Sequence, residues 1–217
     1  MEEIKITAIR QTKKGRFALF CEEEFLFSLD SETFFTQHIQ EGTVFTAADL
    51  ALLRQKSDTR KAKDKALEYL SLRDYASGEL YDKLCLKFDP HSAAEAVAKM
   101  QELGLLNDRG FALHRARYLM NQRKSRSQIL YHLVQKGVDR QTASEVLDEI
   151  SAQAQEDPDL RAACALLEKS YGRKLQQGKR QNVIAALARR GFSMGCIRAA
   201  LEWYEQEYPP EEEFEED

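Results

Sequence analysis

The sequence predicts a mostly α-helical protein: a tandem array of three three-helix repeats preceded by a small antiparallel β-hairpin or sheet plus helix. Apolar residues recur every three or four positions over most of the chain, which predicts amphipathic helices. Similar patterns return at intervals of roughly fifty residues, which indicates stacked units. Only the first thirty residues alternate apolar with polar residues, as strands do.

The amino-terminal residues predict two or three paired strands. Residues 4–8 alternate, the Lys-Lys-Gly sequence at 13–15 favours a turn, and residues 17–21 alternate again. The apolar run 25–29 predicts a third strand with an aromatic face. So small a sheet is marginal in water, and we expect it to pack on another element.

A short helix follows this sheet. Asp30 or Ser31 is suited to cap it, and we expect it to run through Phe34, Phe35 and Ile39. The pair Glu41-Gly42 then closes the helix, because glycine tolerates the backbone conformations found at helix ends.

The next helix opens with a capping-box pattern, Thr46 with Asp49 three residues later, and continues through residues 50–53. The polar stretch 56–65 that follows is the expected boundary to the repeats. It is either a continuous solvated helix or a kinked joint, and the pattern leaves both open.

The first repeat reads as three short helices between Lys65 and Asp108. Gly104 can take the left-handed conformation that ends a helix, and Asn107 or Asp108 can cap the next one. Asp89-Pro90 stands where the other repeats have a glycine turn, and proline suits a first helical position. The expected core consists of Leu67, Leu70, Leu80, Leu84, Val97, Met100 and Leu103.

The pattern recurs twice more. Residues 129–147 align without a gap with residues 183–201. Gly137 and Gly191 lie where a helix must end before a tight turn. The expected caps after these turns are Asp139 and Ser193, and the positions matched between the first two repeats are Leu70 with Leu119, Leu80 with Ile129, Leu84 with Leu133, and Tyr69 with Tyr118.

These patterns divide the chain into five segments. Each repeat is expected to be a right-handed, helix-turn-helix-like unit. The segments are 1–58 (sheet and helices), 59–108 (first repeat), 109–156 (second repeat), 157–207 (third repeat) and 208–217 (acidic tail).

The composition predicts a folded cytoplasmic protein. Hydrophobic residues make up 43% and charged residues 31% of the chain, and no apolar run approaches membrane-spanning length. The first residues are acidic, unlike a secretory signal. The four cysteines and four histidines are scattered, so we expect reduced, buried thiols, no metal and no cofactor. Motifs for phosphate loops, nucleophile elbows and paired-histidine metal sites are missing, so no enzyme is predicted.

Charge is strongly segregated along the second half. Residues 109–140 hold eight Lys or Arg and one acid, whereas residues 205–217 hold eight acids and no base. A basic face could meet acidic protein patches, phosphates or both, or could simply be solvated. The candidate contact residues are Arg115, Arg117, Arg123, Lys124, Arg126, Lys136 and Arg140 in the second repeat, and Arg173, Lys174, Lys179, Arg180, Arg189 and Arg190 in the third.

Acid-free stretches would repel themselves without a partner, unless the acidic tail folds back over them. The aromatic residues Phe111 and Tyr118 are expected in the core, with base stacking as the minority interpretation. Trp203 and Tyr204 are expected to seal the last repeat. Ser125 or Ser127 is expected to cap a helix rather than to bind phosphate.

Seven short motifs follow one another in a fixed order over residues 60–205. They are Ala66-Leu67-Glu68-Tyr69-Leu70, Arg73-Asp74-Tyr75, Glu79-Leu80, Leu103-Gly104-Leu105-Leu106-Asn107-Asp108, Phe111-Ala112, Lys136-Gly137-Val138 and Arg190-Gly191-Phe192-Ser193. Each motif is a common helix-end pattern, but their order and spacing are specific. The ordered set resembles the RecX family, which regulates the bacterial recombinase RecA.

The resemblance implies a non-enzymatic, monomeric protein that binds the groove of the RecA filament on single-stranded DNA. There it would restrain ATP hydrolysis, strand exchange and the SOS co-protease function. Because repeat 1 is nearly balanced in charge, we expect functional contacts to begin past Asp108. The alternatives are a direct binder of single- or double-stranded DNA that uses helix-turn-helix-like repeats, and a scaffold that uses the tail Glu211–Asp217.

Overall fold

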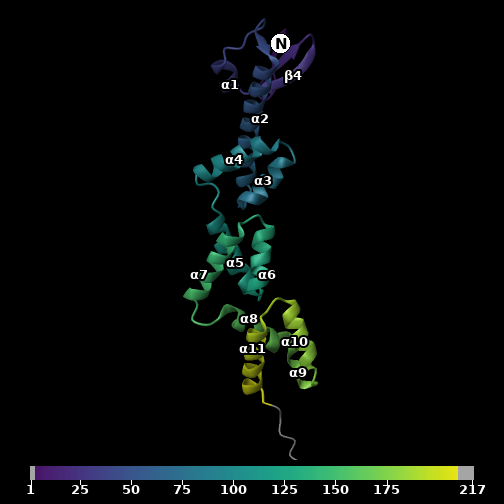
Figure 1. Cartoon of the computed structure of the whole chain (residues 1–217), viewed down its shortest axis with the longest axis vertical. Helices are drawn as coiled ribbons and strands as arrows, with labels where there is room; N and C mark the ends of the chain where they lie inside the picture. The colour runs from purple at the N-terminus through teal and green to yellow at the C-terminus, as the bar shows by residue number, and fades with distance from the viewer. Residues whose placement is uncertain (1–2, 210–217) are drawn as a thin grey trace, which may run out of the picture. The chain divides into compact units, whose positions relative to one another are not determined.

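The structure is a computed structural model that describes residues 3–209, so most of the expected acidic tail lies outside the described residues. The chain forms two compact units, Met1–Leu106 and Asn107–Asp217 (Figure 1). The first unit combines the amino-terminal sheets with the first repeat. The second unit contains the second and third repeats.

The first unit contains a three-stranded antiparallel sheet, as expected, but its first strand begins at residue 8 instead of covering the predicted residues 4–8. Its strands, in the order β2-β3-β4, are β2 (Ala8–Gln11), β3 (Phe17–Cys21) and β4 (Glu24–Leu29). Glu22 and Glu23 make the β3–β4 turn with φ of 46° and 73°. Such turns usually contain Gly, Asn or Asp, so composition alone gives little sign of this one.

A second, two-stranded sheet was not predicted. It pairs β1 (Glu3–Lys5) with β5 (Val44–Thr46) in antiparallel register. β5 has three residues, which is too short for alternation to be recognised, and its partner lies about forty positions away in the sequence.

The short helix α1 (Ser31–Thr36) begins as expected but ends early. The carboxylate of its N-cap, Asp30, accepts a 2.9 Å hydrogen bond from the Thr33 backbone N–H. His38 then takes a φ of 49°, which breaks the helix, so Ile39 reaches the core from a loop rather than from the helix.

The long helix α2 (Ala47–Leu70) joins the sheets to the first repeat without interruption. The Thr46–Asp49 capping box is confirmed, with the Asp49 backbone N–H 3.1 Å from Thr46 Oγ1. Ser57 is fully buried, and its hydroxyl donates a 2.7 Å hydrogen bond to the Ser28 carbonyl of β4. The polar stretch is therefore a continuous helix but not a solvated one, and the expected boundary at residue 58 lies inside it.

The first repeat is completed by α3 (Ser77–Cys85) and α4 (Pro90–Glu102); Pro90 takes the first helical position, as expected, and Asp89 caps the helix. The prediction that Leu67 and Leu103 lie in the core is wrong, because these side chains are 43% and 53% exposed. Ala66 and Tyr69 are buried near the first of these positions, and Met100 and Leu106 near the second. The buried residues of this core are Ala62, Ala66, Tyr69, Tyr75, Leu80, Leu84, Ala93, Ala96, Val97, Met100 and Leu106.

Two tyrosines in this repeat bind cations on their ring faces. Lys83 Nζ lies 4.7 Å from the ring centroid of Tyr69 and 5.2 Å from that of Tyr75, and it donates to the Tyr75 hydroxyl at 3.0 Å. The Arg73 guanidinium lies 3.6 Å from the Tyr75 centroid and forms a bidentate pair with Glu79. The motifs 66–70 and 73–75 therefore supply the aromatic and cationic side chains that stabilise the corner between α2 and α3.

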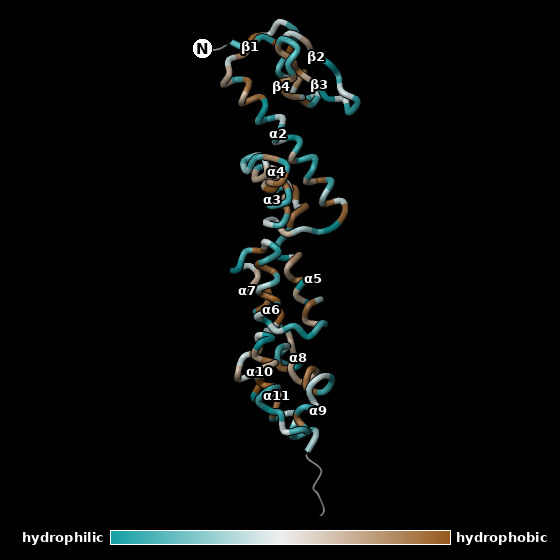
Figure 2. Tube along the Cα trace, turned by 90° about the vertical axis from the view of Figure 1, so that its right-hand side faces the viewer, coloured by the Kyte–Doolittle hydropathy of each residue, from teal (hydrophilic) through white to brown (hydrophobic). Residues whose placement is uncertain are grey.

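The second unit holds the other two repeats. The first helix of the third repeat contains a π-helical turn, which the sequence did not predict. The elements are α5 (Asp108–Asn121), α6 (Arg126–Gln135), α7 (Arg140–Gln153), α8 (Pro158–Leu166), η1 (Leu167–Tyr171), α9 (Gly172–Gln176), α10 (Arg180–Arg189) and α11 (Met194–Glu207). Figure 2 shows brown, hydrophobic residues interspersed with teal, hydrophilic ones along these helices.

The predicted turns of the second and third repeats are confirmed. Gly137 and Gly191 have φ of 81° and 82°, the left-handed region that glycine enters without strain. Asp139 and Ser193 cap the helices that follow.

The sequence match between the first helices of repeats 1 and 2 is wrong by one residue. Tyr118 is 52% exposed although its supposed counterpart Tyr69 is buried. The buried positions Ala62, Ala66 and Tyr69 instead correspond to Ala112, Ala116 and Leu119, each fifty residues further on. Tyr118 therefore lies off the core face of α5 and points to solvent.

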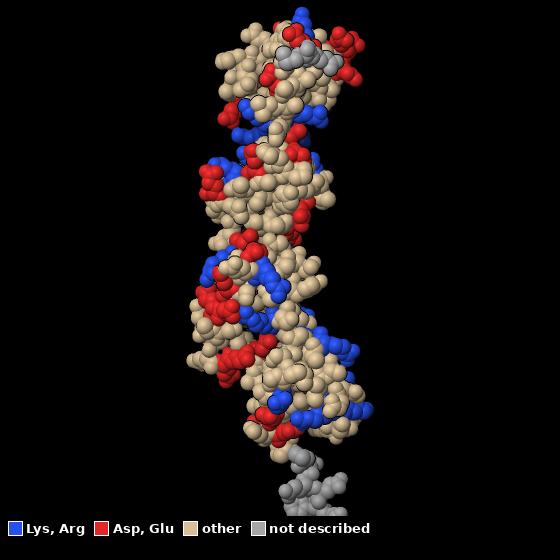
Figure 3. Space-filling view, viewed as in Figure 1, with Lys and Arg blue, Asp and Glu red and all other residues tan. Residues whose placement is uncertain are grey.

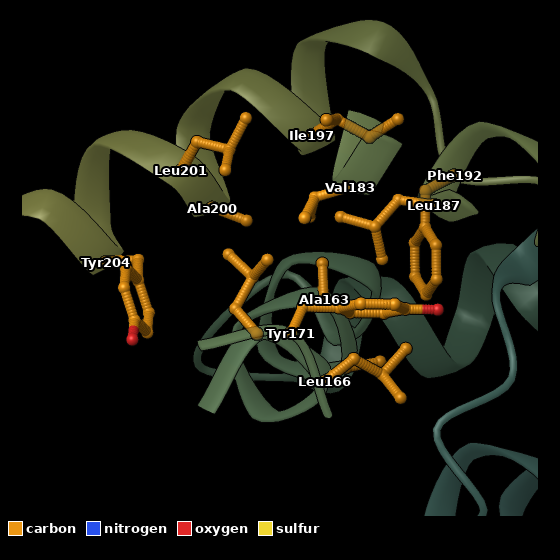
Figure 4. Packing of buried hydrophobic residues seen from close by; sticks show 12 residues of the cluster. Ala163, Leu166, Tyr171, Val183, Leu187, Phe192, Ile197, Ala200, Leu201 and Tyr204 are labelled. Atoms are coloured by element: carbon orange, nitrogen blue, oxygen red, sulfur yellow. The ribbon is translucent and has the colours of Figure 1, made fainter. Parts of the chain in front are cut away.

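The third repeat has the predicted hydrophobic seal. Tyr204 is 7% exposed, and Trp203 packs partly buried against the same cluster. Figure 4 shows side chains of α10 and α11 directed toward those of α8 and η1, among them Leu187, Ile197 and Leu166. A Cβ on Gly172 would lie 2.7 Å from the Tyr204 hydroxyl, so a larger residue there would displace the end of the Tyr204 side chain.

The remaining predictions concern cysteines, metals and membranes. The four cysteines are free and only partly buried, less than expected. In residues 3–209, no three His, Cys, Asp or Glu side chains are grouped as metal ligands, and none of the helices there has the length and hydrophobicity needed to cross a membrane.

Candidate functional site

The candidate basic residues occupy helix ends more than helix faces. In the second repeat, Arg123 and Lys124 form the corner between α5 and α6, and in the third, Arg189 and Arg190 end α10. Figure 3 shows Lys and Arg side chains gathered on the visible face over these repeats, with acidic side chains beside them. Position at helix ends matters because residues there can be brought together by contacts between repeats.

One such contact joins the two corners. Ser125 is fully buried and caps α6, as expected, by accepting a 3.2 Å hydrogen bond from the Gln128 backbone N–H. Its hydroxyl also donates a 2.6 Å hydrogen bond to the Arg190 carbonyl, 65 residues further on. A Cβ on Gly191 would lie 2.9 Å from Ser125 Oγ and 3.0 Å from Ser127 Cβ, so the corners are in close contact.

A second contact holds the same repeats together. The Arg126 backbone N–H, at the start of α6, donates a 2.7 Å hydrogen bond to Asp159 Oδ1 of α8. Burial raises the pKa of Asp159, and the Asp157 carboxylate also raises it, against the opposing influence of Arg126. Asp159 of the third repeat therefore acts as an additional cap for a helix of the second.

These contacts create a cluster that we call the basic corner: Arg123, Lys124, Arg189 and Arg190. Two of its residues come from each repeat, and they flank the Ser125–Arg190 hydrogen bond. Within the described part of the chain, none of the four side chains forms an ion pair with a carboxylate, whereas Arg189 Nε donates to the Ala185 carbonyl at 3.2 Å and Arg190 lies 5.9 Å from the Tyr171 ring centroid. Cations without a carboxylate partner, on two corners whose backbones are in contact, are expected to attract anions.

Other candidates are neutralised within the fold. The Arg126 guanidinium pairs with Asp148 at 2.9 Å, and Arg180 pairs with Glu205. Arg109, which was not a candidate, pairs with Glu149 at 2.6 Å. The expectation that acid-free stretches repel themselves is therefore wrong in part, because acids of α7 and α11 lie beside these bases in space.

The remaining candidates are spread over the second unit. Arg115 Nε donates to His132 Nε2 at 2.9 Å, and its guanidinium lies 5.1 Å from the Tyr118 ring centroid. Lys174 lies 5.7 Å from the Tyr171 centroid. The exposed candidates for which the described residues offer no ion pair are Arg117, Arg140, Arg173, Lys174 and Lys179, and Lys136 is the C-cap of α6.

Several site features were missed or misplaced in the sequence. Ser125 was recognised only as a cap, and Asp159 was not considered at all. Tyr118 was expected in the core, and Tyr131, which is 68% exposed on α6, was not singled out. The core spacing Ala112, Ala116 and Leu119 would have placed Tyr118 outside, but no local pattern reveals the contact between the corners.

Comparison with known proteins identifies all three repeats. Family models described as the first, second and third three-helix domains of RecX match residues 62–100, 107–147 and 157–201. The chain is 30% identical over 215 residues to the Bacillus velezensis protein named Regulatory protein RecX, covering 97% of this chain and 81% of that one. It is 29% identical over 201 residues to the Listeria monocytogenes protein of the same name, covering 91% and 74%.

Solved structures share the fold. A crystal structure titled as regulatory protein RecX superposes with a TM-score of 0.67 at 21% identity, covering 92% of this chain and 99% of that chain. The crystal structure of RecX from Lactobacillus salivarius gives a TM-score of 0.61 at 26% identity, covering 69% and 97%. The repeat matches and the long alignments agree, and this chain belongs to the RecX family of regulatory proteins.

Proposed function

We propose that this chain is a non-enzymatic, monomeric, cytoplasmic regulator that binds the RecA filament on single-stranded DNA. Bound there, it restrains ATP hydrolysis, strand exchange and the SOS co-protease function. The observation that carries this proposal is the match of all three repeats to RecX domains in order. The regulatory names of the relatives support a binding role rather than a catalytic one.

The basic corner is our candidate for the principal contact. It collects cations from two repeats that the Ser125–Arg190 and Arg126–Asp159 hydrogen bonds hold in a fixed relation. A preorganised cluster binds an anionic surface with less loss of conformational freedom than scattered side chains do. Arg126 and Arg180 are weaker candidates because each already has a carboxylate partner.

The decisive measurement is the ATPase rate of RecA on single-stranded DNA with and without this protein. We expect inhibition by the wild type and a large loss of inhibition in the triple variant Arg123→Glu, Lys124→Glu, Arg189→Glu. Lys169→Glu is the matched control, because Lys169 is an exposed base of the same unit outside the basic corner. Its inhibition should equal that of the wild type.

Two results would contradict this proposal. If the wild-type chain does not inhibit the RecA ATPase and binds bare and RecA-coated DNA equally well, regulation of the filament is excluded as its function. Full potency in the triple variant, with unchanged helicity by circular dichroism, would keep the function but exclude the basic corner.

A second candidate is direct DNA binding, which the exposed tyrosines favour. Tyr118 and Tyr131 are 52% and 68% exposed, and Arg115 lies over one of the rings. Exposed aromatics beside cations are suited to stack on unpaired bases. Binding to bare strand that equals binding to the filament, and that is lost in Tyr118→Ala, would favour this candidate over the first.

A further inference from the structure

A polar cleft of about 580 Å³ lies in the first unit, far in sequence from the basic corner. Helices α1, α2 and α4 form its walls. Hydroxyl and amide groups, including those of Thr36, Gln37 and Gln55, supply neutral hydrogen-bonding groups at its lining. Such a cleft suits a charged, hydrogen-bonding ligand rather than an apolar one.

The helix α2 presents three cations to this cleft. Lys56, Arg60 and Lys63 line it at four- and three-residue spacing, so they share one helix face. Seven residues of helix span roughly 10 Å, a length that accommodates successive phosphate groups of a nucleic-acid strand. Figure 3 shows Lys and Arg side chains close together around this part of α2.

Two of these cations are held by exchangeable carboxylates. Arg60 Nη1 lies 3.2 Å from Glu32 Oε2 of α1, and its Nε lies 3.7 Å from Asp64. Lys63 Nζ lies 3.7 Å from Glu95 of α4. The Glu32 and Glu95 side chains are 74% and 48% exposed, and exposed pairs of this kind are weak.

The third cation is available. Lys56 is exposed, and its side chain forms no hydrogen bond or ion pair within residues 3–209. His91 also lines the cleft, with its Nδ1 3.1 Å from the Gln55 amide nitrogen and 3.7 Å from Glu95. An arriving anion thus meets one unpaired cation first and can then replace Glu32 at Arg60.

From this geometry we propose that the cleft between α1, α2 and α4 binds the phosphodiester backbone of a single nucleic-acid strand, with Lys56 as first contact and Glu32 as intramolecular competitor. This site is additional to the basic corner, and it lies before Asp108, whereas the sequence led us to expect contacts past that residue. The row of cations on one helix favours a repeating anion, and the hydroxyl and amide lining favours phosphate oxygens.

The test uses the full chain and a fluorescein-labelled abasic deoxyribose-phosphate oligomer, which has the backbone charge but no bases to stack. Fluorescence anisotropy gives the affinity between about 50 and 200 mM salt. Lys56→Ala should weaken binding about fivefold at low salt. The plot of log affinity against log salt should also become less steep. Its negative slope should decrease in magnitude by about 0.7, the value for one lost contact to a single strand. Lys13→Ala, an exposed base in a turn of the same unit, is the control and should change neither quantity.

Substitution of Glu32 provides a second test, in which the affinity for the oligomer should change in the opposite direction. Glu32→Gln should strengthen binding about fivefold, because Arg60 is released from its partner. Glu24→Gln, an exposed acid of β4 outside the cleft, should have no effect. Lys56→Ala and Glu32→Gln each replace a charged residue of the cleft by an uncharged one. A loss of affinity in the first and a gain in the second would not both be explained by reduced folding stability.

Three results would overturn the proposal. Equal effects of Lys56→Ala and Lys13→Ala on binding would exclude the cleft as the binding site. Displacement of the oligomer by inorganic phosphate at equal phosphate concentration would indicate a site for free phosphate. Tighter binding of a poly-glutamate peptide of equal charge would indicate an acidic protein partner. Loss of RecA inhibition is measured separately, so this proposal can fail while the proposed function stands.

Discussion

Gly191 shows how a single residue controls the geometry of the basic corner. Its φ of 82° requires a left-handed backbone, and its missing side chain leaves room for Ser125 and Ser127 of the neighbouring repeat. Sequence pattern explains the first requirement, because a helix ends there. It does not reveal the second, which arises only when the repeats pack.

Substitution of Gly191 separates these two requirements. Gly191→Ala should lower the free energy of unfolding by roughly 1–2 kcal/mol for the left-handed backbone and by at least about 1 kcal/mol more for the clash with Ser125. Gly178→Ala is the control, because Gly178 has a φ of 69° but open space around it. Chemical denaturation of both variants gives the difference. Equal losses would mean that the corner relaxes without cost.

Asp159 adds a pH-dependent contribution to the same junction. Its pKa is raised in the folded protein, chiefly by burial, so the ionised form lowers stability at neutral pH. The penalty is absent below the unfolded-state pKa and complete above the raised folded-state pKa.

Asp159→Asn tests this sign. The asparagine oxygen can still accept from the Arg126 N–H, so the variant should be more stable than the wild type at pH 7. The advantage should shrink as the pH falls toward 4, where the wild-type carboxyl becomes neutral. Urea denaturation at several pH values measures it. A variant that is less stable at pH 7 would show that attraction to Arg126 outweighs burial.

At the scale of elements, the corner between α2 and α3 depends on cations held on aromatic rings. Lys83 contacts the faces of Tyr69 and Tyr75 and donates to the Tyr75 hydroxyl, all within the first repeat. Both rings are largely buried, so the cation is partly shielded from water and its attraction to the rings is stronger than at an open surface.

Lys83→Met removes the charge and keeps most of the apolar stem. We expect a loss of about 0.5–2 kcal/mol in the free energy of unfolding. Lys99→Met, which removes an exposed pair with Glu102, should cost no more than about 0.5 kcal/mol. Thermal or urea denaturation distinguishes the two. Equal small losses would mean that the rings pack as well without the cation.

Helix ends were the most predictable elements, and long-range pairings the least. Thr46, Asp139 and Ser193 were correctly identified as caps, because capping depends on three or four consecutive residues. The strand β5 was missed, and the sequences of α2 and α5 were matched one residue out of register. Both features depend on partners distant in sequence. The same holds for the site: its basic residues were visible in the sequence, but their partition into paired and unpaired cations required the fold.

At the scale of the whole molecule, α2 makes the first unit a single structure. The helix packs against β4 through Ser57 and supplies Ala62, Ala66 and Tyr69 to the core of the first repeat. The two halves of that unit therefore share one continuous backbone element and are expected to unfold together.

A helix-breaking substitution tests this cooperativity. Thr59→Pro should cost roughly 3 kcal/mol or more, because proline removes a hydrogen bond in the middle of α2. Hydrogen exchange followed by mass spectrometry should show equal loss of protection in β3–β4 and in α4. Loss confined to the strands would mean that the sheets open independently of the first repeat.

The packing of Trp203 has a practical consequence. It is the chain's single tryptophan, and it lies partly buried against the α8–α11 cluster. Tryptophan fluorescence responds to hydration of the indole ring. Because the other repeats contain no tryptophan, this fluorescence reports on the third repeat alone. Rapid mixing with a partner would thus resolve, without any attached dye, when this one repeat becomes ordered or covered.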